Sequence, residues 1–315
     1  MPTVLVTGAG GYIGSGLAHA LRNAGWKVRA LSREAAPYLE MGQIVADLAR
    51  DADAAQAACE GVDAVVHLAG DNEVVAAREP ASALGGTVLA SERLVEAVPE
   101  SGVKRFVYLS TVHVYGERMV PGATLTEDLR PEPRAPYAIA RLASEHRVRA
   151  LASAGVEVVV LRLTNSLGAP LHPAVDRWTL LSNDLSRQGV STGRLELRSS
   201  GMQWRDFVTL GDVRATIEAA CRSEPAVLPA GVYNLGHGEP MTIRALAALV
   251  QDAFERCTGE RPELHAPDHV GDPPEPYHVS VKRLTKHGLS ATTPIADAVE
   301  DTVRFCIEHK EALAG

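Results

Sequence analysis

The sequence predicts an α/β protein with a doubly wound parallel sheet and a smaller C-terminal lobe. Three observations predict this fold class. Short apolar segments of strand length alternate with Ala-rich segments of helical spacing through the first half of the chain. The apolar segments are nearly continuous, as expected for a parallel sheet covered by helices on both faces. After about Asn165 the alternation fades into loops and mixed patterns, which indicates that a less regular lobe begins there.

Each expected element corresponds to one segment of this alternation. The strands are expected at residues 4–7, 27–31, 64–68, 105–110 and 156–162, which are rich in Val, Leu and Phe. The helices between them are expected at residues 14–24, 52–59, 86–98 and 137–153. Residues 130–136 hold three prolines and are therefore expected to form a loop that leads into the last of these helices.

Composition and charge exclude several classes of protein. The chain has 315 residues, 46% of them hydrophobic, which is enough for one large core or two unequal ones. Its formal net charge is −8, without a basic stripe, so a nucleic-acid partner is not expected. We expect no secretion signal, because residues 1–7 lead directly into an apolar strand without a basic segment, and no segment approaches the ~18 apolar residues of a membrane span. The four scattered cysteines are interpreted as reduced core thiols, so we expect a cytoplasmic protein without a membrane partner.

A glycine-rich turn after the first strand predicts a dinucleotide site. Gly8, Gly11 and Gly14 permit a tight turn, a close approach of the backbone to a diphosphate, and close packing of helix against sheet. Tyr12 and Ile13 lie in the same turn, and a helix is expected to begin near Gly14 with its N-terminus facing the diphosphate. The sequence therefore predicts a Rossmann domain of residues 1–165 and 206–230, and a substrate-binding lobe of residues 166–205 and 231–315.

The end of the second strand indicates which cofactor is bound. An NAD site usually has an acidic residue there, whereas a nearby arginine suits a 2′-phosphate. This chain has Ser32 and Arg33 and no carboxylate, so NADP is slightly favoured over NAD. The alternative is that Arg33 is only a solvated surface side chain. Asp47 and Leu48 end the third short strand, where a side chain could contact the adenine.

Seven motifs, taken together, carry a family resemblance. In order they are Thr7-Gly-x-x-Gly-x-x-Gly14, His67-Leu-Ala-Gly70, Ser110-Thr-Val-His-Val-Tyr-Gly116, Tyr137-x-x-x-Arg141, Leu161-Arg-Leu-Thr-Asn165, Arg205-Asp-Phe-Val208 and Tyr233-Asn-Leu-Gly236. Their order resembles the extended short-chain dehydrogenase/reductases, and more narrowly the NAD-dependent epimerase/dehydratase group that acts on nucleotide sugars. The resemblance covers nearly the whole chain. It implies that Leu68, Ala69, Gly70 and Leu163 contact the cofactor, and that the protein is a homodimer through residues 86–98 and 137–153.

The expected catalytic residues are Thr111, Tyr137 and Arg141. Hydride transfer at a secondary alcohol needs a group that takes or returns the hydroxyl proton, and a phenol can do so when a nearby cation lowers its pKa. Arg141 lies four residues after Tyr137 and hence on the same helix face, where it would also contact the nicotinamide ribose. Thr111, at the end of the fourth long strand, completes the set that the family implies by a hydrogen bond to the reacting oxygen.

Two departures from the family pattern bear on the reaction. The family has lysine where this chain has Arg141, which keeps the charge but changes a compact donor into a planar fork. A weakly active or non-catalytic relative therefore stays open as an alternative. Sugar dehydratases of the family follow the threonine with an Asp-Glu pair, whereas this chain has Val112 and His113, so elimination of water is disfavoured. His113 is expected either to act on the substrate near neutral pH or to be structural.

The substrate is expected at Asn165, His113 and Arg205. The family places a sugar or phosphate contact at Asn165 and a diphosphate clamp at Arg205, although Arg205 could instead pair with Asp206 or Asp212. Two tryptophans could stack on a base, but helix packing is the favoured interpretation for Trp178 and Trp204. No metal is expected, because His265, Asp268 and His269 lack supporting ligands.

The sequence thus predicts an NAD(P)-dependent enzyme acting on a secondary alcohol or ketone of a nucleotide-linked sugar. Epimerisation through a transient ketone is the most concrete mechanism. The alternative is an NADPH-dependent ketoreductase of a small molecule, which the preference for NADP favours slightly. The two differ in turnover, because an epimerase recycles its cofactor and a reductase consumes it.

Overall fold

A seven-stranded parallel sheet forms the centre of the molecule in the computed structural model, which describes residues 1–222, 228–271 and 274–313. Strand order across the sheet is β12-β7-β5-β4-β1-β2-β3. The first strand is therefore near the centre of the sheet. Strands β2 and β3 are added on one side of it and the later strands on the other side, as in a doubly wound dinucleotide-binding fold. The strands are β1 Thr3–Thr7, β2 Lys27–Ser32, β3 Gln43–Val45, β4 Ala64–His67, β5 Arg105–Thr111, β7 Glu157–Leu163 and β12 Gly231–Leu235.

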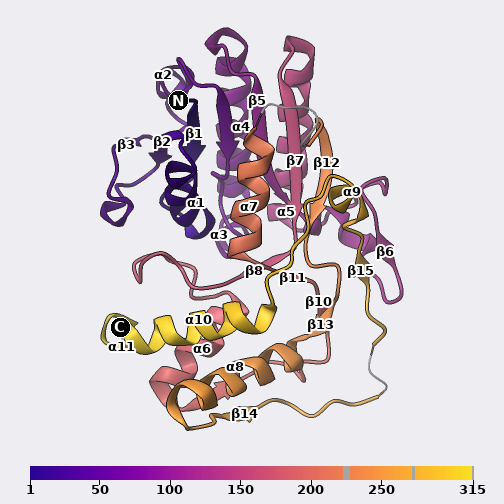
Figure 1. The fold of residues 1–315 in the computed structure, drawn as a ribbon. Coiled ribbons are helices and arrows are strands. Elements are labelled where there is room, and N and C mark those ends of the chain that lie inside the picture. Colours follow the sequence, from indigo (N-terminus) through magenta and orange to yellow (C-terminus); the bar gives the residue numbers. More distant parts are fainter. Residues whose placement is uncertain (223–227, 272–273, 314–315) are drawn as a thin grey trace.

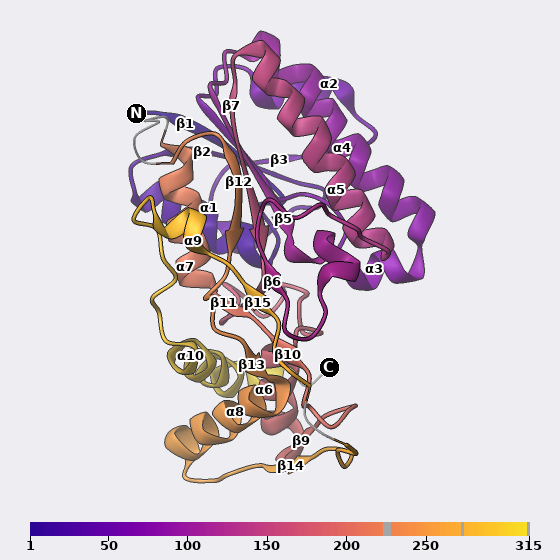
Figure 2. The same ribbon diagram turned by 90° about the vertical axis from the view of Figure 1, so that its right-hand side faces the viewer.

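Helices cover both faces of this sheet (Figures 1 and 2). One face packs on α1 and α7 through a core that includes Val4 and Val6, and the opposite face packs on α2, α4 and α5 through a core that includes Leu5. Successive strand residues point to opposite faces, which explains why the strands are apolar throughout rather than alternating. The helices are α1 Tyr12–Asn23, α2 Ala52–Cys59, α3 Glu73–Arg78, α4 Pro80–Ser101, α5 Pro136–Arg149 and α7 Leu210–Cys221.

Helix ends differ from the expected ones for local reasons. Helix α1 begins at Tyr12, two residues before the expected start near Gly14, because Gly11 is its extended N-cap residue. Helix α4 begins at Pro80 rather than at residue 86, since proline is well suited to a first turn and the Gly85–Gly86 pair lies inside the helix. The expected helix over 137–153 is α5 followed by the short 3₁₀ turn Ala150–Ala154.

The C-terminal lobe is a helical layer beyond the carboxyl ends of the strands (Figure 1). Its core joins α6, α8 and α10 through residues such as Leu185, Val250 and Val299. These helices are α6 Leu181–Thr192, α8 Ile243–Thr258 and α10 Ile295–Glu308, followed by α11 Lys310–Leu313, while α9 Lys282–Thr285 packs near β12. Short strand pairs complete the fold: β10 Trp204–Arg205 with β13 Met241–Thr242, β11 Phe207–Thr209 with β8 Asn165–Leu167, β14 Glu263–His265 with β9 Arg194–Glu196, and β15 His278–Val279 with β6 Thr124–Leu125.

One expected boundary is wrong. Residues 231–235 were assigned to the lobe, but they form β12, which pairs in parallel with β7 at the edge of the main sheet. Sequence periodicity missed this strand because it stands apart from the regular alternation of the first half. The other expected divisions of the chain stay predictions.

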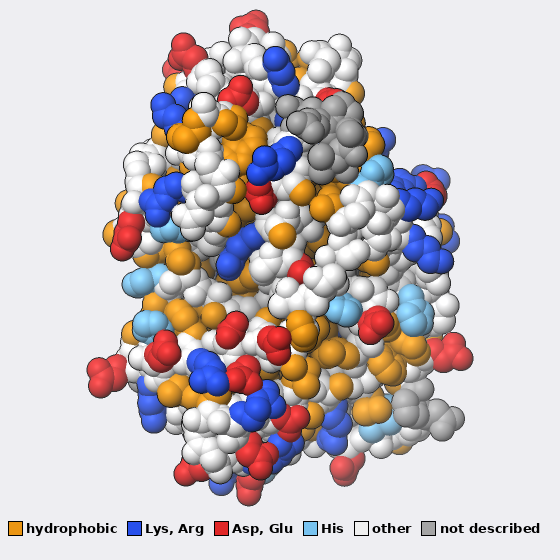
Figure 3. Space-filling view, in the orientation of Figure 1, with side chains coloured by type: hydrophobic (Ala, Val, Ile, Leu, Met, Phe, Trp, Pro, Cys, Tyr) orange, Lys and Arg blue, Asp and Glu red, His pale blue; other side chains and the backbone are white. Residues whose placement is uncertain are grey.

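The surface and the helices bear on two further expectations. Blue and red side chains are mixed over the face in Figure 3, in keeping with a sequence without a basic stripe. Among the described helices, none has both the length and the apolar character that a bilayer span requires.

Candidate active site

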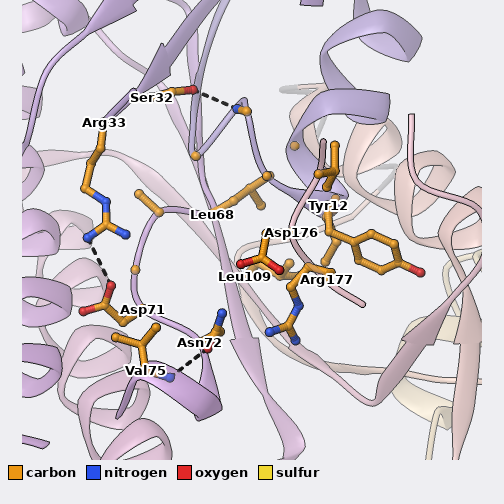
Figure 4. A pocket seen from close by; sticks show the side chains of 18 of the residues that line it. Tyr12, Ser32, Arg33, Leu68, Asp71, Asn72, Val75, Leu109, Asp176 and Arg177 are labelled. Carbon is orange, nitrogen blue, oxygen red and sulfur yellow. Dashed lines mark hydrogen bonds and ion pairs between the residues drawn. The ribbon is translucent and has the colours of Figure 1, made fainter. Parts of the chain in front are cut away.

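A large cavity lies at the carboxyl ends of the central strands, between the sheet and the C-terminal lobe (Figure 4). Its volume is about 1510 Å³. Common ligand pockets measure ~300–1,000 Å³, so this cavity has room for a dinucleotide and a second ligand. It is lined by every residue that the sequence predicts for cofactor, reaction or substrate: Gly8, Gly11, Tyr12, Ile13, Gly14, Ser32, Arg33, Asp47, Leu48, Leu68, Ala69, Gly70, Thr111, His113, Tyr137, Arg141, Leu163, Asn165 and Arg205. Their individual roles stay predictions.

The glycine-rich turn has the geometry that a dinucleotide cradle needs. Gly8 has φ +69°, a left-handed backbone that favours glycine. A β-carbon on Gly14 would lie 2.1 Å from the carbonyl oxygen of Gly8, so α1 can lie this close to the turn only with glycine there. The hydroxyl of Ser32 accepts a hydrogen bond from the N–H of Gly10 at 2.8 Å and fixes the turn against the end of β2.

The N-terminus of α1 fits a diphosphate. Its N-cap residue Gly11 contributes no side-chain hydrogen bond, and its first turn contains no acidic residue. The first N–H groups of the helix thus face the cavity with the positive end of the helix dipole and without a competing anion. The side chain of Tyr12 has a structural role, because its buried hydroxyl donates to the carbonyl of Gly168 at 2.6 Å. The phenol of Tyr12 therefore holds the lobe, and only its backbone can meet a phosphate.

The end of the cavity beside β2, where the sequence predicts the ribose of the cofactor, holds a charge pair that the sequence pattern does not reveal. The guanidinium of Arg33 lies 3.1 Å from the carboxylate of Asp71, which follows β4. Arg33 is 66% exposed, as the alternative of a solvated surface side chain predicts. It also forms an ion pair with Asp71, which that alternative does not predict. At the adenine end, Asp47 accepts the N–H of Ala49 at 3.0 Å and lies 3.5 Å from Arg50.

Two of the predicted catalytic side chains, Tyr137 and Arg141, lie against each other in the cavity. The Arg141 guanidinium carbon is 5.4 Å from the centroid of the Tyr137 ring, at a distance typical of a cation–π contact. Arg141 is buried, and two backbone carbonyls, of Ala69 and Leu109, accept from it at 3.4 Å. Burial opposes its charge, but the phenols of Tyr108 and Tyr137 outweigh this and the pKa of Arg141 lies above its usual value. The group is therefore a permanent cation beside the Tyr137 ring.

The hydroxyl of Thr111 lines the cavity and is held by a local hydrogen bond. Thr111 ends β5 and is the N-cap residue of the following 3₁₀ turn, where its Oγ1 accepts the N–H of His113 at 3.2 Å. Because the oxygen accepts from the backbone, its own O–H stays available to donate into the cavity. The strand end and the turn thus fix the position of this donor.

A series of buried, hydrogen-bonded side chains links the helix of Tyr137 to the central strands. Thr7 Oγ1 lies 2.7 Å from His67 Nδ1, His67 Nε2 lies 3.0 Å from Ser91 Oγ, and the Ser91 hydroxyl donates to Ser144 at 2.9 Å. The series joins β1, β4, α4 and α5. Burial, with the charge of Arg141 as a second cause, lowers the pKa of His67 to about 3. His67 is therefore neutral at physiological pH, and it couples the helix of Tyr137 to the two central strands.

Arg205 lacks a carboxylate partner within the described residues. The carboxylate of Asp206 accepts the N–H groups of His237 and Gly238, at 3.0 and 2.7 Å, and burial raises its pKa to about 6. Asp212 is held by Thr209 and other residues of the lobe junction. The alternative that Arg205 pairs with Asp206 or Asp212 is therefore wrong, and its guanidinium can receive an anion from the cavity.

His113 and Asn165 line the cavity beside Arg205. Loss of surrounding water, with the positive charge of Arg205 as a second cause, lowers the pKa of His113, so this imidazole is neutral at physiological pH. The side-chain amide of Asn165 donates to the carbonyl of Asp206 at 2.8 Å, which leaves its oxygen available as an acceptor. These groups offer one cation and neutral donors and acceptors to a substrate.

Sequence reasoning missed several residues of this cavity. Tyr38 donates to the carbonyl of Gly10 at 2.6 Å, and its ring stacks on His172 of the lobe at 5.1 Å between centroids. Arg177 projects into the cavity from the lobe (Figure 4) and pairs with Glu73 of α3 at 3.1 Å. These side chains come from segments without a motif or a periodic pattern, so the sequence held no local signal for them.

The tryptophans and the histidine-rich loop have structural surroundings. Trp178 is buried against Phe305, and the indole N–H of Trp204 donates to Pro274. Neither tryptophan lines the cavity. The contact of Trp178 with Phe305 of α10 is in keeping with the expected helix packing, whereas Trp204 lies on strand β10 and its helix-packing role stays a prediction. His265 lies 3.2 Å from Glu263, and across the described parts of the chain no group of three or more metal-ligating side chains is found.

The fold and the cavity define the class first: an α/β protein of the dinucleotide-binding kind with its cavity at the carboxyl ends of a parallel sheet. Comparison with known families then gives the family. The model of the NAD dependent epimerase/dehydratase family matches residues 4–236. The chain belongs to this family, and it is an enzyme of the oxidoreductase and epimerase type, as the resemblance implied.

Individual relatives agree with this assignment. The dTDP-6-deoxy-L-talose 4-dehydrogenase (NAD(P)(+)) of Kitasatospora kifunensis is 33% identical over 285 residues, which are 85% of this chain and 84% of the relative. The 2-alkyl-3-oxoalkanoate reductase of Stenotrophomonas maltophilia is 31% identical over 77% of this chain and 73% of its own. The crystal structure of the UDP-glucose 4-epimerase of Thermus thermophilus in complex with NAD superimposes with a TM-score of 0.80, at 28% identity, over 96% of this chain and 98% of that one.

Proposed function

We propose that this protein is an NAD(P)-dependent oxidoreductase or epimerase that acts on a secondary alcohol or ketone of a nucleotide-linked sugar, through Thr111, Tyr137 and Arg141. One observation carries the proposal: these side chains share a cavity with a glycine-rich turn at one end and with Asn165 and Arg205 at the other. A cofactor, a reacting alcohol and a diphosphate each have suitable groups there.

The cofactor would be held by the turn of Gly8 to Gly14, the N-terminus of α1 and the end of β2. NADP is slightly favoured over NAD, because Arg33 lies at the ribose end and β2 ends without a carboxylate. When bound, the nicotinamide accepts a hydride from a carbinol carbon or returns it to a ketone. The preference is tested by equilibrium binding, and it fails if NAD binds tenfold tighter than NADP, which is about 1.4 kcal/mol.

The residues around the reacting alcohol would transfer its proton, stabilise the charge that forms and bind the rest of the substrate. The phenol of Tyr137 takes the hydroxyl proton as the carbinol is oxidised and gives it back on reduction. Thr111 donates a hydrogen bond to the reacting oxygen, and Arg141 supplies a fixed positive charge beside the phenolate that forms. Arg205 and Asn165 bind the diphosphate and the sugar.

Epimerisation through a transient ketone is the favoured reaction. Tyr137 would remove the proton in the first half, and return it in the second after the ketosugar has turned its other face. The second candidate is a ketoreductase that uses NADPH on a small molecule; the similarity to a 2-alkyl-3-oxoalkanoate reductase favours it. A weakly active cofactor-binding relative, motivated by Arg141, is the third.

Single-turnover absorbance at 340 nm separates these candidates. The purified protein is loaded with nicotinamide cofactor and mixed with sugar nucleotides, ketosugars or simple ketones. An epimerase gives a transient change with an epimerised product, whereas a reductase consumes NADPH in proportion to product. If the cofactor binds tightly and no substrate of either class changes the absorbance, both enzymatic proposals are wrong.

We also propose a homodimer through α4 and α5. The two helices lie side by side on the surface (Figure 2), and Leu89 on α4 and Ile139 on α5 are 46% and 40% exposed. Two antiparallel copies of such a pair would bury both side chains in a four-helix contact. Light scattering should give the dimer mass for the native chain and the monomer mass for Ile139→Glu; Ile139 is the residue to change because Leu89 also lines the cavity. The cytoplasmic location stays a prediction.

A further inference from the structure

A carboxylate holds the arginine that faces the ribose end of the cavity. Arg33 follows β2 and Asp71 follows β4, and their side chains meet at 3.1 Å (Figure 4). The two strands flank β1, so the pair bridges the two sides of the glycine-rich turn. The second strand ends without an acidic residue, yet the fold supplies one from a different strand.

Asp71 and Arg33 differ in how firmly the surrounding structure holds their side chains. Asp71 is only 9% exposed, and its N–H donates to Thr87 of α4 at 3.1 Å. A β-carbon on Gly86 would lie 3.7 Å from its carboxylate, so that carboxylate lies against α4. Arg33 is 66% exposed on a long flexible stem. In the described part of the chain, Arg33 is the one side chain recorded within ion-pair distance of the Asp71 carboxylate. The carboxylate is therefore the fixed member, and the guanidinium is the one that can move.

The fork of a guanidinium binds a carboxylate or a phosphate, and here the two would compete. A 2′-phosphate on the adenosine ribose has to draw Arg33 away from Asp71 or accept the nearby negative charge of that carboxylate. A 2′-hydroxyl has neither conflict, and a carboxylate is the group that commonly accepts from it.

We propose that Asp71 is a specificity-determining residue for the cofactor. By holding the Arg33 guanidinium, it weakens binding of the cofactor with a 2′-phosphate relative to the cofactor with a 2′-hydroxyl. The inference rests on the proposed function, because it requires that the cavity binds these dinucleotides.

Equilibrium dissociation constants for NAD and NADP test the proposal, measured by titration calorimetry at one fixed low ionic strength. The variants are Asp71→Asn, Arg33→Ala, their combination, and Glu34→Gln. Glu34 is the matched control because it is an exposed acid beside Arg33 that lines the same cavity and has no ion pair recorded in the described residues. Circular dichroism reports whether each variant is folded.

Asp71→Asn should shift the ratio of the two constants about fivefold toward NADP, the size expected from a partly exposed ion pair. The shift should shrink at high salt. It should be smaller when Arg33 is alanine, because only the direct repulsion between the Asp71 carboxylate and the 2′-phosphate is then removed. An unchanged ratio in Asp71→Asn, or an equal shift in Glu34→Gln, overturns the role of Asp71. If the folded native protein and its variants bind neither dinucleotide, the proposed function fails first and the inference fails with it.

Discussion

The guanidinium of Arg141 occupies the space that a side chain on Gly70 would need. A β-carbon on Gly70 would lie 3.1 Å from Arg141 Nη2 and 3.2 Å from its Cζ, and 3.0 Å from the methyl group of Thr87. Gly70 also has φ +139°, where glycine is favoured. The broad fork at position 141 and the missing side chain at position 70 therefore fit each other.

Gly70→Ala should lower kcat/KM at least tenfold, since overpacking costs about 1–3 kcal/mol and would displace the guanidinium. The loss should be smaller in an Arg141→Lys background, because the narrower ammonium relieves the contact with residue 141, while the close contact with Thr87 is the same in both backgrounds. Backbone strain at position 70 is common to both backgrounds, so the difference between them isolates the contact. Equal losses in the two backgrounds would contradict the steric pairing.

Arg141 itself should be needed as a cation rather than as a guanidinium. We expect Arg141→Lys to keep or raise kcat and Arg141→Ala to reduce it by about 100-fold or more, the range of a positioned proton-transfer group. Steady-state kinetics with the substrate found at 340 nm would measure both. An alanine variant with native activity would mean that the charge has no part in the reaction.

Gly14→Ala should disturb the cofactor turn. Its new β-carbon would lie 2.1 Å from the Gly8 carbonyl oxygen, so α1 or the turn must move. We expect about 1–3 kcal/mol of destabilisation and at least tenfold weaker dinucleotide binding. Gly42→Ala is the control, because nothing lies within 4 Å of a β-carbon there; urea denaturation and calorimetry should show it close to the native protein.

Stability should fall in acid because of His67. Its pKa is lowered to about 3 in the folded protein and is near 6.5 when unfolded, so between these values the unfolded chain binds the extra proton. The free energy of unfolding should then decrease by up to about 1.4 kcal/mol for each pH unit below 6.5. Urea denaturation at several pH values measures this slope. His67→Gln should be less stable at pH 7.5 but show a shallower decline; an unchanged slope would mean that His67 does not titrate as its burial requires.

The sequence predicted most of the fold and the lining of the cavity because their signals are local. Strand and helix periods, the glycine spacing and the position of Thr111 at a strand end each depend on neighbouring residues. The starts of two helices were predicted less accurately. Helices α1 and α4 begin earlier in the chain than expected, because Gly11 is the N-cap residue of α1 and Pro80 lies in the first turn of α4. The strand at residues 231–235 was missed because its pairing with β7 joins distant segments.

By itself the sequence determined the class of fold and the kind of chemistry, since apolar periodicity dictates which faces are buried and seven ordered motifs define the family. Only the tertiary structure decided how individual charges are used. Arg33 meets Asp71, Arg141 fits against Gly70, and Arg205 is left without a carboxylate in the described residues. Each relationship joins residues from different elements, so it depends on where strands end and helices pack, and no spacing along the chain encodes it.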